Sequence, residues 1–120
     1  MKFLCIVHFD GSALDMMDPT EKREFDRESL GYDEKLMAGG KFIHAEALQS
    51  PSSASLVKIR NGRMSVTDGP YAEAKEQMGG FILIDASDRA DAIAIAAGIP
   101  LARLGTIEVR PIYEIPDPNG

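Results

Sequence analysis

The stretch Gly79–Pro100, GGFILIDASDRADAIAIAAGIP, decides the fold because it places a strand and a helix directly one after the other. Its first eight residues, GGFILIDA, are typical of a buried strand, since the run is almost continuously apolar. In the following SDRADAIAIAAG, Ser87 or Asp88 can cap a helix, and Gly98 ends it. The helix is rich in Ala and Ile, so we expect it to lie close against a sheet.

A second strand and helix open the chain. KFLCIVHF, at Lys2–Phe9, is predicted to be a strand that is buried on both faces, and residues 10–17 are predicted to be a loop. The next helix should begin at Asp18, which can cap it, because Pro19 suits the first helical position. The helix should end at Gly39–Gly40.

The apolar residues of this first helix are spaced to form one broad stripe that faces the sheet. The stripe consists of Phe25, Leu30, Tyr32, Leu36 and Met37.

Further strands are predicted from alternation and turn signals. In KFIHAEALQ, residues 41–49, one face carries Phe42, His44, Glu46 and Leu48, and the other carries Ile43, Ala45 and Ala47. SLVKIR and RMSVT are strands joined by Asn61–Gly62, the strongest short signal for a hairpin. GTIEVRPIYEI, residues 105–115, is the last strand, in which Pro111 indicates an edge or a bulge.

The predicted order of elements is β-α-β-β-β-β-α-β. This order is typical of an α+β, ferredoxin-like antiparallel sheet with two helices on one face, here with an inserted β-hairpin. Because the helices leave the other face of the sheet bare, we expect a homodimer whose sheet faces pack together. Residues 1–115 are expected to form a single domain, and residues 116–120 a C-terminal tail.

The composition of the chain excludes several classes of binding partner and several structural features. The chain has 120 residues, of which 44% are hydrophobic and 27% charged, and its net charge is −6. No basic run is present, so nucleic acid and anionic membranes are not expected as partners. The single cysteine, Cys5, excludes an internal disulfide and is expected to be a small buried hydrophobe. The apolar runs are too short to span a bilayer, and a cytoplasmic location is expected.

The segment Val66–Phe81, VTDGPYAEAKEQMGGF, combines turn residues with ionisable groups, and the chain closes with the motif EVRP at 108–111. Together these motifs closely resemble the YCII-related family, in the branch known as the DGPF domain. The likeness extends over nearly the whole chain, including GGKFIHAEALQSP. It implies a ferredoxin-like domain of the dimeric α/β-barrel type. It implies no settled activity, although some members are encoded beside extracytoplasmic-function sigma factors.

Shorter members of the wider family carry a His on the first helix, which has been proposed to act with an Asp as a catalytic pair. The first helix here, PTEKREFDRESLGYDEKLMA, contains no His. That pair therefore cannot be assigned to this chain.

The corner at Asp68–Gly69–Pro70 has a structural and a functional interpretation. Asp can cap the following N–H groups, Gly frees the backbone and Pro presets φ for a turn. In the functional interpretation, Asp68 faces a cleft between sheet and helices and acts as a general base or a polar anchor, with Gly69, Pro70 and Tyr71 as ligand-binding neighbours. Glu73 and Lys75 either form a solvated surface or line the rim of the same pocket. Residues 66–81 as a whole are expected to form a turn followed by a short helix.

Two histidines and one arginine on strands are further candidates. His44 shares a strand face with Glu46, and together they are the best general acid–base pair if that face forms a cleft. His8 and His44 have no ligand spacing, and no metal site is expected. The alternative is a site of two His and one carboxylate, which would require His8 and His44 to converge with Glu46 or Asp10. Arg110 can bind a carboxylate, but a salt bridge with Glu108 or Glu46 is the favoured interpretation.

Two functions remain open. One is a cofactor-independent small-molecule enzyme of lyase, isomerase or hydrolase type, with Asp68 and His44 in the cleft and Arg110 as an anion anchor. The other is a non-catalytic dimeric module that binds a metabolite or a protein, with a link to sigma-factor regulation. No phosphate loop, dinucleotide fingerprint, nucleophile elbow or zinc signature is present, and no cofactor is expected.

Overall fold

A computed structural model describes all 120 residues of the chain. The elements in order are β1 (Lys2–Phe9), α1 (Gly11–Asp15), α2 (Pro19–Ala38), β2 (Phe42–Ala47), η1 (Pro51–Ser53), β3 (Ser55–Arg60), β4 (Arg63–Asp68), β5 (Gln77–Asp85), α3 (Arg89–Ala97), η2 (Pro100–Arg103) and β6 (Thr106–Pro111).

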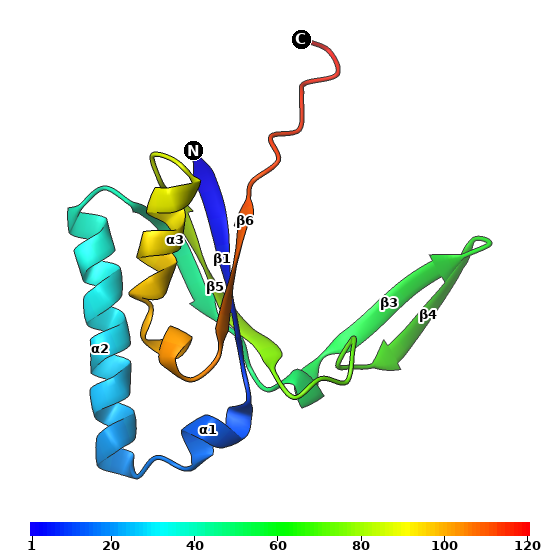
Figure 1. Cartoon of the computed structure of the whole chain (residues 1–120). Coiled ribbons are helices and arrows are strands. Elements are labelled where there is room, and N and C mark those ends of the chain that lie inside the picture. The colour runs from blue at the N-terminus through cyan, green and yellow to red at the C-terminus, as the bar shows by residue number, and fades with distance from the viewer.

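Four strands form one antiparallel sheet in the order β2-β5-β1-β6. Helices α2 and α3 lie on the same side of this sheet (Figure 1), so the predicted α+β ferredoxin-like fold is confirmed. No helix is both long and apolar enough to cross a membrane.

The predicted hairpin is present but stands apart from the body. Strands β3 and β4 pair only with each other, and they project from the lower end of the sheet (Figure 1). Asn61 and Gly62 have φ angles of 53° and 74°, the left-handed conformation that a two-residue hairpin turn requires. We call residues 55–68 the arm.

The core lies between the sheet and the helices. Phe3, Cys5 and Ile84 are its largest fully buried side chains. Helix α3 contributes mainly alanines, and these let it lie close to the sheet, beside β6, where it packs on core side chains of β1 and β5, as its composition predicts. Burial raises the pKa of the Cys5 thiol to about 11, so this residue behaves as the small hydrophobe that was expected.

Local signals place the ends of both long helices. The Asp18 carboxylate accepts a hydrogen bond of 2.8 Å from the backbone N–H of Glu21 at the start of α2. Asp88 likewise accepts one of 2.8 Å from Asp91 N–H at the start of α3. Gly39 is the residue at which α2 ends.

Five local predictions need correction. Residues 11–15 form helix α1 rather than loop, because Asp10 caps the N–H of Ser12 at 3.0 Å. No helix follows the corner at 68–70; the segment is a series of bends, and the Gln77 side-chain amide bonds to the carbonyls of Ala72 and Ala74 instead.

The third correction concerns the faces of β2. A register shift between Phe42 and His44 places Phe42 opposite Ile84, where it packs against the core, while His44 lies opposite Leu83 on the other face. The shift adds one residue to the strand and so reverses the predicted alternation at its start. Phe42 and His44 therefore do not share a face.

The fourth correction is the width of the apolar stripe on α2. Phe25 and Leu36 are buried, and Tyr32 is half-buried, but Leu30 and Met37 are mostly exposed. The sheet covers a narrower strip of the helix than the spacing predicted. The fifth correction is the length of the last strand, β6, which stops at Pro111 rather than continuing to residue 115.

Candidate functional site

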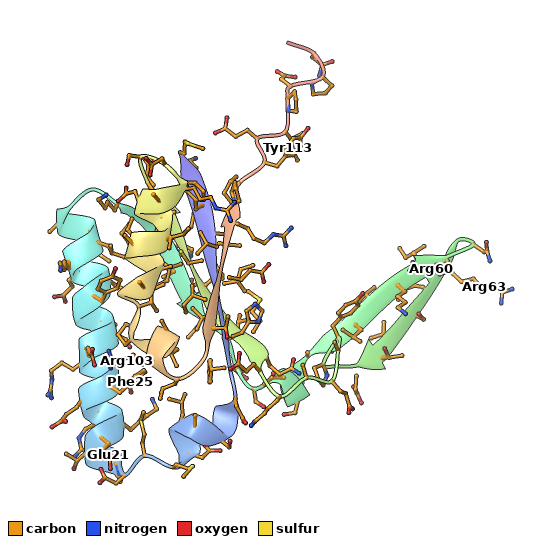
Figure 2. The ribbon with its side chains drawn as sticks, in the orientation of Figure 1. Glu21, Phe25, Arg60, Arg63, Arg103 and Tyr113 are labelled. Atoms are coloured by element: carbon orange, nitrogen blue, oxygen red, sulfur yellow. The ribbon has the colours of Figure 1, made fainter.

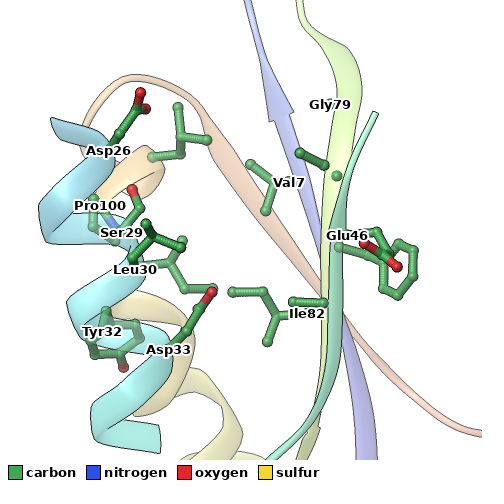
Figure 3. Close-up of a pocket in the computed structure, with 16 residues that line it drawn as sticks. Val7, Asp26, Ser29, Leu30, Tyr32, Asp33, Glu46, Gly79, Ile82 and Pro100 are labelled. Carbon is green, nitrogen blue, oxygen red and sulfur yellow. The ribbon is translucent and has the colours of Figure 1, made fainter. Parts of the chain in front are cut away.

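A cavity of about 470 Å³ lies between α2 and the sheet (Figure 3). Helix α2 supplies one wall, strands β1, β2 and β5 supply the opposite wall, and the segment leading into η2 closes one end. The lining residues are Val7, Asp26, Ser29, Leu30, Tyr32, Asp33, Ala45, Glu46, Ala47, Gly79, Gly80, Phe81, Ile82, Ile99, Pro100 and Leu101.

Small residues on the strands leave the space open. Ala45, Ala47 and the Gly79–Gly80 pair present little or no side chain where β2 and β5 run side by side. A Cβ at Gly80 would lie 2.7 Å from the backbone oxygen of Glu46, and one at Gly79 would overlap the ring of Phe9. Close packing around the strand therefore requires both glycines. As a result, no side chain projects from these positions into the cavity.

Asp33 is the distinctive polar group of the cavity. It is half-buried, and Figure 3 shows it directed from α2 into the space in front of Ile82. Burial raises the pKa of its carboxyl, with no hydrogen bond or ion pair to offset the loss of water. A carboxyl group with a raised pKa can both donate and accept a proton nearer to neutral pH than an ordinary aspartate.

Apart from Ser29, which is half-buried, the remaining polar groups on the helix side are already engaged or lie at the rim. The Tyr32 hydroxyl donates to the backbone oxygen of Ile95 at 2.5 Å. Asp26 is exposed and pairs with Lys22 at 2.7 Å. No Lys, Arg or His side chain lines the cavity, so it suits a neutral or cationic ligand with a substantial apolar part and disfavours an anion.

Glu46 belongs to the opposite face of the sheet. Figure 3 shows its carboxylate beyond β2, on the side away from α2. Its Oε2 lies 3.1 Å from His44 Nε2, and the His44 ring lies 6.1 Å from that of Phe81. The structure thus brings His44 and Glu46 together, as the strand pattern predicted, but it places them behind the cavity.

The uncovered sheet face combines an apolar strip with charged pairs at both edges. The strip is formed by Leu4, Ile6, Phe81 and Leu83 on the two central strands. His44–Glu46 lies on β2 at one edge. Toward the other edge, His8 Nε2 lies 3.0 Å from Glu108, which Arg110 approaches at 3.8 Å.

One of these pairs bears on a question that the sequence left open. The favoured salt bridge of Arg110 is confirmed, with Glu108 as its partner. The two histidines each contact a different glutamate, and no group of three His, Cys, Asp or Glu side chains converges as a metal ion would require.

The corner after β4 lies outside the cavity. Asp68 is exposed, and its neighbour Gly69 donates its N–H to the backbone oxygen of Ala54 at 2.7 Å, which fixes the base of the arm. Tyr71, Glu73 and Lys75 are exposed as well; Gly69 and Pro70 are half-buried. Within one chain, the structure does not gather Asp68, His44 and Arg110 into a common pocket.

Sequence reasoning missed Asp33 as a site residue. The signal was present in the spacing, because Phe25, Ser29, Asp33 and Leu36 follow one another at intervals of four, four and three residues. Those intervals place a carboxyl group on the buried stripe of an amphipathic helix, where an unpaired aspartate is unusual.

Comparison with known proteins gives the family but no activity. Residues 1–116 match the YCII-related domain. A protein of Rhizobium meliloti (strain 1021), named only as uncharacterized, is 29% identical over 114 residues, which is 93% of this chain and 92% of that protein.

Proposed function

This chain belongs to the YCII-related domain family, and we propose that it binds a small, uncharged or cationic molecule in the cavity beside Asp33 and transfers a proton on it without a cofactor. The observation that carries the proposal is a half-buried, unpaired carboxyl in a largely apolar cavity, with its pKa raised by burial.

Asp33 alone can support proton-shift chemistry. Its carboxylate removes a proton from an acidic C–H group of the ligand, and the resulting acid returns that proton to a second carbon or helps a leaving group depart. Both routes need a single acid–base group, and both balance without an oxidant or a metal. Isomerase or lyase chemistry is therefore favoured over hydrolysis, which needs an activated water as well.

A binding module without turnover is the second candidate. It is favoured by the absence of a second unpaired acid–base group among the lining residues, since Asp26 is held by Lys22 at the rim. In this case Asp33 would provide a hydrogen bond or a counter-charge for the ligand, and the protein would act in regulation.

A ligand screen with matched variants separates the two functions. Neutral and amine-bearing ring compounds, including lactones and enols, would be screened by NMR line broadening and then followed for chemical change. Asp33→Asn should preserve the shape of the cavity and abolish turnover by an enzyme. For a binding module, the wild type should bind without turnover. Glu34→Gln, on the exposed side of the same helix, is the control and should change neither result.

One result would contradict both functions. If no compound of either class produces shifts at residues 29–33 or 80–82, the cavity is not a ligand site.

The DGPF-type motif motivates the test of a second candidate site. We propose that the chain belongs to the DGPF branch, and support comes from Asp68–Tyr71 and the residues that follow. This second site lies outside the Asp33 cavity. In it, Asp68 and His44 remain predicted catalytic residues, and Gly69, Pro70, Tyr71, Glu73, Lys75 and Arg110 remain predicted ligand contacts. Asp68→Ala should weaken ligand binding without unfolding the chain. Unfolding by this variant would favour the structural interpretation of the corner.

We further propose that the protein is a cytoplasmic homodimer whose sheets face each other. Support comes from the apolar strip formed by Leu4, Ile6, Phe81 and Leu83, which the helices leave uncovered. A second copy would cover the strip symmetrically, with the ion pairs near the sheet edges forming a polar rim. Sedimentation equilibrium at micromolar concentration tests this, and Ile6→Glu should produce monomers.

A further inference from the structure

The arm is apolar on one face. Its register pairs Val57 with Val66 and Ile59 with Met64, and these two pairs lie on the same face because side chains alternate along each strand. The exposed fractions of the four side chains range from 57% to 69%. Lys58, Ser65 and the Arg60–Arg63 pair lie on the other face. The arm is therefore amphipathic, and its apolar face is mostly exposed.

A hairpin of this kind is not stable by itself. Two strands without a third strand or a helix to pack on are marginal in water. Neither strand joins the four-stranded sheet. The radius of gyration is 16.9 Å, whereas a compact chain of 120 residues would have about 14 Å. The arm therefore needs a surface outside its own chain.

The charge of the arm differs from that of the body. Of 13 basic and 19 acidic side chains, the arm holds three basic ones and only one acidic one, Asp68. Figure 2 shows Arg60 and Arg63 pointing into solvent at the tip. The rest of the chain, with ten basic and 18 acidic side chains, is complementary to this tip.

The direction of the arm indicates which molecule covers its apolar face. In Figure 1 the helices lie to the left of the sheet, and the arm extends to the right, away from them. A second copy packed on the uncovered sheet face would occupy the space beside the arm. We infer that the arm docks through Val57, Ile59, Met64 and Val66 on a second copy of this chain, so that two copies exchange arms.

This inference rests on the self-association proposed above and adds a separate contact to it. In a two-fold symmetric dimer both arms are docked in the same way, because each copy docks its own arm on the other copy. An acidic second copy also matches the basic tip. Arm docking therefore explains both the exposed apolar face and the charge difference within the chain.

Two variants of β4 test the docking. Val66→Asp and Ser65→Asp each add one negative charge at neighbouring positions, but on opposite faces of the arm. Val66→Asp should raise the dissociation constant of the dimer at least about tenfold, because it buries a charge at the docked face in both copies. Ser65→Asp should change it less than about threefold. Sedimentation equilibrium of the full chain gives both values.

Amide hydrogen exchange locates the contact directly. The amides of residues 55–68 should be protected in the wild-type dimer and should lose that protection on dilution below the dissociation constant. Amides in β1 and β5 serve as the internal control, because they belong to the folded body at any concentration.

Each other outcome overturns the inference. A dimer in which Val66→Asp and Ser65→Asp behave alike would show that association uses the sheet and leaves the arm free. Arm protection that does not depend on concentration would show that the arm is supported within one chain. If the protein were a monomer at every concentration tested, no second copy would be present for the arm to dock on. Ligand binding by the cavity is measured separately and survives all three results.

Discussion

Tyr32 on α2 donates its phenolic hydrogen to the backbone oxygen of Ile95 on α3, across 63 residues of sequence. This bond links the two helices above the core and fixes the tyrosine that forms part of the cavity wall. It also explains Gly98, where a Cβ would lie 2.5 Å from the tyrosine hydroxyl oxygen. The glycine that ends α3 thus makes room for the contact between the helices.

Removing this hydroxyl should destabilise the chain modestly. Tyr32→Phe deletes the donor, but the N–H of Gly98 still reaches the Ile95 oxygen at 3.1 Å. We expect the free energy of unfolding to fall by about 1 kcal/mol, the usual net value of one hydrogen bond. Urea denaturation measures it. Tyr113→Phe, on the exposed tail, is the control; an equal loss in both variants would contradict the role of the bond.

Shortening a core side chain should cost more than shortening a surface one. Ile84 is fully buried between the sheet and the helices, whereas Ile93 on α3 is half exposed. Ile84→Val should lower the free energy of unfolding by about 1 kcal/mol, because it leaves a small cavity. Ile93→Val removes the same methylene and should cost less than about 0.5 kcal/mol. Reversal of this order in denaturant titrations would place the core elsewhere.

Asp33 should make stability depend on pH in a defined direction. Its pKa is raised in the folded chain, so ionisation favours the unfolded state. The destabilisation caused by ionised Asp33 is absent below its unfolded-state pKa of about 3.9. It is fully present above its raised folded-state pKa. Asp33→Asn, which cannot ionise, should therefore be more stable than the wild type at pH 7.

The difference between the two proteins should shrink as the pH falls through the raised folded-state pKa, and it should vanish well below about 3.9, where Asp33 is protonated in both states. Thermal unfolding at several pH values measures this difference. Glu34→Gln removes one negative charge from the exposed side of the same helix and controls for net charge. A stability difference that is constant across this pH range would show that burial does not act on Asp33.

Cys5 should react slowly with thiol reagents. Burial raises its pKa to about 11, so only about 0.1% of the thiol is ionised at pH 8. An ordinary thiol is ionised to roughly 20% at that pH, and the folded chain should therefore react at least about 100-fold more slowly than the chain in denaturant. Absorbance of a released aromatic thiol measures the rate. Equal rates would show that β1 opens readily.

Local signals predicted most of the elements. The caps at Asp18 and Asp88 and the Asn61–Gly62 turn each depend on groups within a few residues of one another, and each is present as expected. Two errors concerned local contacts, the Asp10 cap of α1 and the bonds of the Gln77 amide, and the error in the faces of β2 arose where a longer-range contact intervened. The register shift in β2 depends on pairing with β5, which no property of residues 42–44 specifies.

The candidate site was only partly accessible to sequence reasoning. The His44–Glu46 contact follows from alternation on one strand, and it was predicted. The cavity requires α2 to stand opposite a wall of small residues from strands that are far apart in sequence, so Asp33 was not recognised there.

By itself, the sequence determined the ferredoxin-like order of elements, the ends of the two long helices and the hairpin turn, because these follow from side-chain chemistry repeated over short intervals. Only the tertiary structure decided which polar groups lose water. Burial depends on what lies opposite a side chain, and that is set by sheet order and helix position. For this reason Asp33 faces a cavity and His44 lies behind it, although both were equally visible in the chain.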